Sequence, residues 1–325
     1  MPHDDVADLL IDSRRLRLDA SWREVRRRVE TGDLAQVRRG TFADATALAA
    51  LHIEQRHQLE VLAAVRAQGT DSAVISHVSA AVMWDLPLFG VAPRKVHITM
   101  RHGLEAHSSN PVLRHRDELP EADVTMVCGI RCTSLERTVI DVARTASLAT
   151  GVAAADAALR RIAWNERSWV YAADEAERFK EGLRARVARM AGRRGVRRAR
   201  HVIEFADGRA QLPGESVSRV LLAELGFTDI RLQVRIPNGR GGWYHVDFGL
   251  PEADAWGEFD GLAKYVDPSM TDGRSPRDVV RAEKEREDWI RASTNRPVAR
   301  WSFADLGTAA ALRRRLAIYG IRPPY

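Results

Sequence analysis

The sequence predicts an α/β (α+β) protein with more than one compact unit, and three observations support this fold class. The chain has 325 residues, whereas one domain usually takes about 100 to 200. Helical periodicity and short strand patterns follow one another over the first half. The last third has the order helix, three strands, helix, strand. We expect a small N-terminal module, a middle mixed α/β domain and a C-terminal α/β domain.

Residues 1–45 have the pattern of two helices and a hairpin. Helices are expected from Asp4 to Ile11 and from Ser21 to Glu30, where Ser21 is a suitable N-cap. Gly32 ends the second helix, and Leu34 to Val37 and Gly40 to Phe42 form two short strands. This order is compatible with a winged-helix module.

Arginines gather on the second helix and on the hairpin of this module. The formal net charge of +6 also favours a polyanionic partner. Double-stranded DNA is the expected partner, because arginines on both elements can reach phosphates. A solvated basic helix is the alternative. The predicted DNA-binding residues are Arg23, Arg26, Arg27, Arg38 and Arg39.

Residues 46–150 predict a mixed α/β domain, and residues 151–207 a helical basic linker. The domain has helical patterns over Leu48 to Ala67 and around Ser76 to Asp85, with strands such as Val96 to Met100 and Thr125 to Val127. The linker is arginine-rich between Arg184 and Arg200. Phosphate binding and a solvated helix end are equally compatible with those arginines.

Histidines and cysteines do not predict a zinc site. The histidines of the middle region match no zinc spacing, so we expect surface or hydrogen-bonded side chains at His97, His102, His107 and His115. His77 is interpreted as a packing residue near a helix start. Cys128 and Cys132 lack two further ligands and are expected as reduced thiols of a cytoplasmic protein.

The N-terminus and the apolar pattern predict no membrane partner. No stretch approaches the roughly 20 apolar residues that span a bilayer. Acidic Asp4, Asp5 and Asp8 stand where a secretory signal needs a basic start.

Residues 208–325 carry acids on consecutive elements. Glu215 lies in the first turn of a helix that follows Pro213. Asp247 lies on the second arm of a hairpin, off its apolar face, and Glu258 and Asp260 share one side of a third strand.

Glu215, Asp247 and Glu258 are therefore expected to converge at one edge of a sheet. Three carboxylates repel one another unless a cation or a proton neutralises them, and hard oxygen ligands suit Mg²⁺. Such an ion activates water for attack on a phosphodiester. The alternative is that each acid is a solvated surface residue.

Short motifs of the C-terminal region are Gly214 to Ser216, Tyr244 to Phe248, and Gly257 to Gly261 with Lys264 and Tyr265. In these motifs the chain resembles a very-short-patch-repair-like endonuclease domain of the PD-(D/E)XK nuclease superfamily, over about residues 205–310. Motifs of the front half are Gly32 to Ala43, Ser76 to Ala81, Trp84, Val96 to Thr99, Thr133 to Thr138 and Asp141. In these the chain is similar to the AbiEi-type antitoxin family, to about residue 144.

The resemblance implies a winged-helix DNA reader, a restriction-endonuclease-like domain and a cognate toxin as a further partner. Glu215, Asp247 and Glu258 match the acidic positions of the superfamily, and Asp260 resembles a further acid of the repair-like variant. The lysine expected two residues after the last acid is replaced by Asp260, and the nearest lysine is Lys264. The expected function is Mg²⁺-dependent DNA cleavage, and the alternative is a DNA-binding regulator with an inactive nuclease fold. An RNA substrate is a third alternative.

Overall fold

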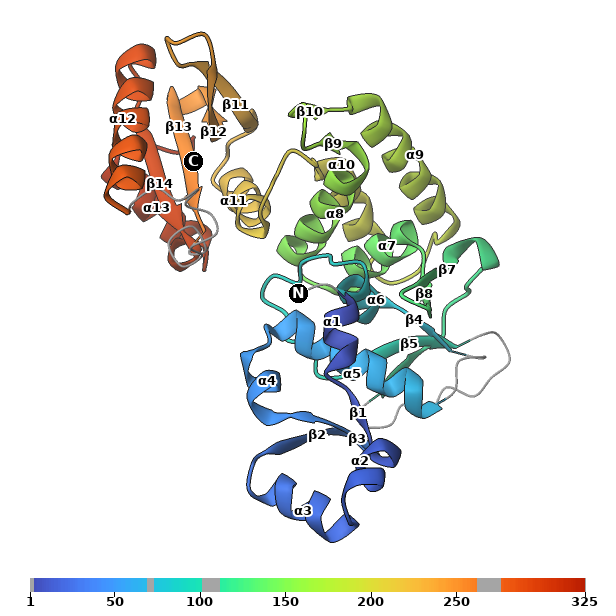
Figure 1. Cartoon of the computed structure of the whole chain (residues 1–325). Helices are drawn as coiled ribbons and strands as arrows, with labels where there is room; N and C mark the ends of the chain where they lie inside the picture. The colour runs from blue at the N-terminus through green and yellow to red at the C-terminus, as the bar shows by residue number, and fades with distance from the viewer. Residues whose placement is uncertain (1–2, 69–72, 101–111, 262–275, 325) are drawn as a thin grey trace. The chain divides into compact units, whose positions relative to one another are not determined.

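The computed structural model describes residues 3–68, 73–100, 112–261 and 276–324. Helices and several sheets share the chain, which confirms the α/β class. Contacts divide it into two units (Figure 1). Unit 1 comprises Met1–Ala154 and Glu177–Glu204, and unit 2 comprises Ala155–Ala176 and Phe205–Tyr325. No helix in the described ranges is long and apolar enough to cross a membrane.

Unit 1 begins with short helices around a three-stranded sheet of order β1-β3-β2. As predicted, Ser21 caps a helix, and its Oγ accepts from the backbone N–H of Glu24 at 3.3 Å. The expected first helix is shorter than predicted, because Ile11 pairs with Phe42 and Asp12 then caps a further helix. The elements are α1 (His3–Asp8), β1 (Ile11–Asp12), α2 (Ser13–Asp19), α3 (Trp22–Glu30), β2 (Leu34–Arg38) and β3 (Thr41–Asp44).

A five-stranded sheet of order β6-β5-β4-β8-β7 forms the centre of unit 1. The helix expected over Leu48 to Ala67 is two helices, because Leu51 is extended and buried between them. The elements are α4 (Ala45–Ala50), α5 (Ile53–Gln68), β4 (Ala73–Ile75), α6 (His77–Met83), β5 (Val96–Met100), β6 (Val112–His115), β7 (Val124–Val127), β8 (Ile130–Thr133) and α7 (Leu135–Thr145).

The segment predicted as a helical linker contains α8 (Leu148–Ala163), α9 (Ala173–Arg189) and α10 (Val196–Phe205). Two arginines of its basic run are used in packing. Arg198 Nε donates to the carbonyl of Ala143 at 3.0 Å, and Arg193 forms an ion pair with Asp117. These contacts favour a structural role for both arginines over phosphate binding.

Unit 2 contains a four-stranded sheet of order β11-β12-β13-β14. β11, β12 and β13 are antiparallel, and β14 is parallel to β13. The predicted order of helix, three strands, helix and strand is confirmed. The elements are α11 (Pro213–Glu224), β11 (Arg231–Pro237), β12 (Trp243–Leu250), β13 (Ala255–Asp260), α12 (Pro276–Thr294), β14 (Val298–Ser302) and α13 (Ala309–Ile318), preceded by the pair β9 (Trp164–Asn165) and β10 (Val170–Tyr171).

Helices α11 and α12 cover opposite faces of this sheet (Figure 1). On the α11 face, a Cβ at Gly214 would lie only 2.1 Å from Phe259 Cζ, so the helix backbone approaches that ring closely. Trp301 Nε1 donates to Ser218 Oγ of α11 at 2.7 Å. On the other face, Ile290 of α12 belongs to a buried cluster with Trp256 of β13. This packing sets the start of α11 beside the middle of the sheet.

Candidate functional site

Glu215 and Asp247 converge on one glutamine. Glu215 is the third residue of α11 and is 2% exposed, although its pattern placed it off the apolar stripe. Its Oε2 accepts from Gln233 Nε2 at 3.2 Å and from the backbone N–H of Gln211 at 2.9 Å. Gln233 Nε2 also lies 3.4 Å from Asp247 Oδ1. The structure therefore brings two of the three predicted acids together.

The backbone around this pair is irregular. Gln233 has a φ of 48°, a left-handed conformation uncommon for a residue with a side chain. The β11–β12 register places Leu232 opposite Phe248 and Val234 opposite Val246, and the intervening pair is not formed. Asp247 Oδ2 instead accepts from the backbone N–H of Phe259 on β13 at 2.8 Å. The strained residue thus lies where the two acids meet, as is common at functional sites.

Burial and like charge make this a site for a proton or a cation. Burial, and secondly the Asp247 carboxylate, raise the pKa of Glu215 from 4.5 to about 8. At neutral pH the pair therefore holds a proton when no cation is bound. A divalent cation would replace that proton and relieve the repulsion.

Glu258, the third predicted ligand, is engaged by two arginines. It is 6% exposed, forms an ion pair with Arg286 of α12, and lies 3.0 Å from Arg300 Nη2 of β14. Burial raises its pKa, the two arginines oppose that rise, and the carboxylates of Asp247 and Glu283 add to it. Glu258 is therefore already paired with two cations, and its role as a metal ligand stays a prediction. Half-buried Asp260 ends β13, and Lys264 lies outside the described residues.

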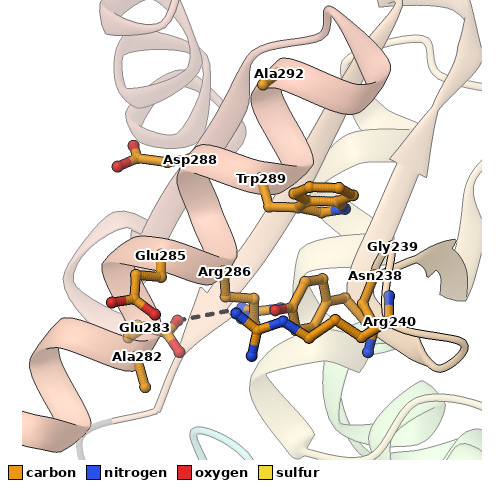
Figure 2. Close-up of a pocket in the computed structure, with 11 residues that line it drawn as sticks. Asn238, Gly239, Arg240, Ala282, Glu283, Glu285, Arg286, Asp288, Trp289 and Ala292 are labelled. Atoms are coloured by element: carbon orange, nitrogen blue, oxygen red, sulfur yellow. Dashed lines mark hydrogen bonds and ion pairs between the residues drawn. The ribbon is translucent and has the colours of Figure 1, made fainter.

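A cavity of about 930 Å³ opens beside Arg286 and is shown in Figure 2. Trp289 lies on one side, with Nε1 donating to the carbonyl of Pro237 at 2.9 Å. Arg286 and Arg240 lie below its ring, and Glu283 pairs with Arg286 at 3.2 Å (Figure 2). The cavity therefore combines two arginines with three acids, Glu283, Glu285 and Asp288, around an aromatic ring.

A second cavity, of about 340 Å³, adjoins the acidic pair through Gln233. Its aromatic side chains come from the β9–β10 hairpin and from β12. The rings of Trp169 and His245 lie 4.8 Å apart. Trp164 Nε1 and His245 Nε2 are buried without a hydrogen-bond partner among the described residues. The sequence pattern contained no signal for this cavity, because residues 164–171 fell in a predicted linker.

The predicted DNA-binding arginines differ in availability. Arg23, Arg26 and Arg39 are exposed. Arg27 forms an ion pair with Glu24 at 2.6 Å, and Arg38 is half-buried, where burial lowers its pKa. The helix α2 adds exposed residues that were not predicted, since the helix itself was not: Arg14, Arg15 and Arg17.

A cluster of three histidines lies in unit 1: His77 at the start of α6, His97 on β5 and His115 on β6. One ring nitrogen from each lies within 4.8 Å of the others. Among the described residues, these three side chains form a cluster that could hold a metal ion. His115 Nε2 and His97 Nδ1 are 3.1 Å apart, which confirms hydrogen-bonded side chains at these positions. His102 and His107 lie outside the described residues.

The three rings are neutral at pH 7. The pKa is lowered to about 3 for His77, to about 3 for His97 and to about 4 for His115. Burial is the largest cause of each shift, and neighbouring cations or histidines follow. No sequence motif could reveal the cluster, because the sheet joins residues that are far apart in the chain.

No family model matches this chain. Two proteins of Mycobacterium tuberculosis, the uncharacterized proteins Rv2248 of strain H37Rv and MT2308 of strain CDC 1551, are each 31% identical to it over 148 residues. The match covers 46% of this chain and 49% of each relative, so the chain spans about half the length of these curated relatives. The crystal structure of the RV2827C protein from Mycobacterium tuberculosis aligns with 67% of this chain and 78% of its own, at 13% identity and a TM-score of 0.35.

Proposed function

We propose that the chain is a DNA-associated protein of AbiEi antitoxin type in which unit 2 cleaves phosphodiester bonds with Mg²⁺. The observation that carries the proposal is the meeting of Glu215 and Asp247 at Gln233. Two carboxylates held this close, one of them buried, form a site whose neutral state needs a bound proton or cation.

The donor set fits a hard cation in part. Glu215 and Asp247 supply carboxylate oxygens and Gln233 an amide, which are ligands that Mg²⁺ accepts together with several waters. Bound there, Mg²⁺ would supply Lewis acidity and an activated water. Asp247 is held in place by the Phe259 amide. Arg286 pairs with Glu258 and Glu283, and it would take the role of the superfamily's lysine by exchanging one of these partners for the substrate phosphate.

The smaller cavity, at Trp169 and His245, supports a nucleic-acid strand as the substrate. Aromatic rings stack on bases without regard to sequence, and such contacts contribute about 1 to 3 kcal/mol per base. The cavity at Trp169 and His245 shares Gln233 with the acidic pair, so a base stacked there would place its phosphate near the carboxylates. Exposed Arg23, Arg26 and Arg39 of unit 1 supply phosphate contacts to double-stranded DNA.

The test is cleavage of supercoiled and linear DNA with Mg²⁺ or Mn²⁺, and with a chelator. Asp247→Asn should abolish metal-dependent nicking, because it removes a carboxylate and retains the side-chain volume. Glu224→Gln is the matched control, since Glu224 is an exposed acid on the same helix as Glu215. Nicking that persists in Asp247→Asn would refute the assignment.

A second function, a DNA-binding regulator with an inactive nuclease fold, is favoured by one observation. Arg286 and Arg300 already neutralise Glu258, and Asp260 occupies the expected lysine position. Such a regulator should bind its promoter without Mg²⁺ and lose affinity steeply with salt. Replacing Arg26 and Arg39 with Ala should weaken that binding, while Arg178→Ala on exposed α9 should not. A cognate toxin is the further partner expected for an antitoxin.

A further inference from the structure

We propose that His77, His97 and His115 bind one divalent transition-metal ion of zinc type. The cluster lies in unit 1, and its ligand chemistry differs from that of the acidic pair in unit 2. Imidazole nitrogens suit zinc, cobalt, nickel and copper, whereas magnesium takes oxygen ligands. The proposal is therefore independent of nuclease activity.

The distance between the ring nitrogens fits such an ion. Zinc binds imidazole nitrogen at about 2.0 to 2.1 Å in tetrahedral geometry, so two of its ligands are roughly 3.3 Å apart. His115 Nε2 and His97 Nδ1 are 3.1 Å apart. The third nitrogen, from His77, lies within 4.8 Å of both.

The backbone holds the three residues in place. The N–H of His97 donates to Ser79 Oγ at 2.8 Å, and its carbonyl accepts from the N–H of Ser76 at 3.0 Å. Strand β5 is thereby fastened to the start of α6, which carries His77. Strands β5 and β6 are parallel, with Thr99 opposite His115, which sets His97 and His115 on neighbouring strands. These contacts fix the backbone positions of the three residues.

His77 carries two further signs of a built site. Its φ of 53° places it in the left-handed region, which costs energy for a residue with a side chain. Its Nδ1 is bonded to Ser76 Oγ at 3.0 Å and lies 3.9 Å from Asp141 Oδ2. A carboxylate behind a histidine is the common outer partner of metal-binding imidazoles, since it orients the ring and increases its basicity.

The arginines near the cluster are paired with acids. Arg137 and Arg144 lie near His77, and Asp117 and Asp141 lie near His115. Arg137 is paired with Asp141 at 3.0 Å, and Arg144 with Asp117 at 2.9 Å. Arg193 also pairs with Asp117, and Lys95 acts on His97 as a further cation. An incoming cation therefore meets arginines that acids hold, with some positive charge remaining around the site.

The stacking of the His77 and His115 rings must change when the ion binds. The rings of His77 and His115 are stacked, with centroids 3.6 Å apart and planes 14° apart. An ion lies near the plane of each ring that binds it, so it cannot be in the planes of two stacked rings at once. Binding therefore turns one ring out of the stack, and water supplies the fourth ligand.

The test is titration of the full chain with Co²⁺, followed by visible absorption, and competition with Zn²⁺. The Asp247→Asn background removes the acidic pair as an alternative site. We expect one ion per chain and the intense visible bands of four-coordinate cobalt. His97→Gln and His115→Gln should each weaken binding roughly 10- to 100-fold or more. His52→Gln, an exposed histidine of the same unit, is the matched control and should bind as the native chain does.

X-ray absorption of the zinc-loaded native chain gives a readout that requires no variant. Three nitrogen ligands from imidazole are expected, together with a zinc-dependent rise in the Tm of unfolding. A spectrum with only oxygen ligands, failure of the native chain to bind Zn²⁺, or binding by both ligand variants equal to that of the control would each overturn the proposal. Failure of DNA cleavage would leave it unaffected.

Discussion

Replacing Glu215 by Gln should stabilise unit 2, and the gain should depend on pH. The carboxyl is 2% exposed, and its pKa is raised from 4.5 to about 8 in the folded chain. An acid with a higher pKa in the folded than in the unfolded state binds its proton more tightly when folded. The folded state therefore loses stability as the pH rises above 4.5, and the loss is complete above about pH 8.

The size of the stability loss follows from the pKa shift of Glu215. Each pKa unit corresponds to about 1.4 kcal/mol, so the penalty is about 3 kcal/mol at pH 7 and about 5 kcal/mol at pH 9. A glutamine at position 215 resembles the protonated acid. Its side-chain oxygen can accept from the Gln211 N–H, and its NH₂ group can donate to Gln233 once the Gln233 amide has flipped to present its oxygen. Below pH 4.5 the native chain and the variant should be equally stable.

Urea unfolding at pH 4, 7 and 9 measures this difference. Tryptophan fluorescence reports mainly on unit 2, because only Trp22 and Trp84 of the eight tryptophans lie in unit 1. Glu224→Gln should change little at any of these pH values. Added Mg²⁺ should narrow the gap at pH 7, since it binds the ionised pair. A stability gain that is the same at pH 4 and pH 9, or no gain at pH 9, would refute the electrostatic account of the site.

Three further outcomes are expected. Gly257→Ala should destabilise unit 2 by about 1 to 3 kcal/mol or more, because the new Cβ would lie 2.3 Å from Trp301 Cη2. Urea unfolding measures this loss, and a neutral effect would show that the ring can move. Arg137→Met should cost unit 1 about 3 to 5 kcal/mol, because it removes the buried guanidinium that pairs with Asp117, Asp123 and Asp141 and leaves three carboxylates with fewer cations. Thermal unfolding measures the loss, and a stabilised variant would contradict the expectation. A maleimide should label exposed Cys128 and leave Cys132 unmodified in the folded chain, since burial raises the pKa of the Cys132 thiol. Mass spectrometry of the peptides measures this, and labelling of Cys132 would contradict the expectation.

Local patterns predicted the elements of unit 2 well. The alternation of residues 243–248, the glycines near 239–242 and the apolar stripe of the first helix are short-range signals, and the structure has β12, a turn and α11 at these places. In unit 1 the same kind of reasoning missed α2 and the break at Leu51. The pairing of Ile11 with Phe42 ends the preceding segment before α2, and the side chain of Leu51 is buried, and neither contact is contained in a local pattern.

The sequence by itself determined the α/β class and the order of elements in unit 2, because periodicity and capping act over a few residues. It also placed Glu215 and Asp247 among three acids expected to converge, and the structure brings these two together at Gln233. Tertiary structure alone decided the partners of Glu258, whose charge goes to Arg286 and Arg300 from two other elements. It also decided the histidine cluster. His77, His97 and His115 match no motif, yet a helix start and two parallel strands bring their rings together. The sequence gives the chemistry of each side chain, but which side chains become neighbours depends on how the strands pair within the sheets.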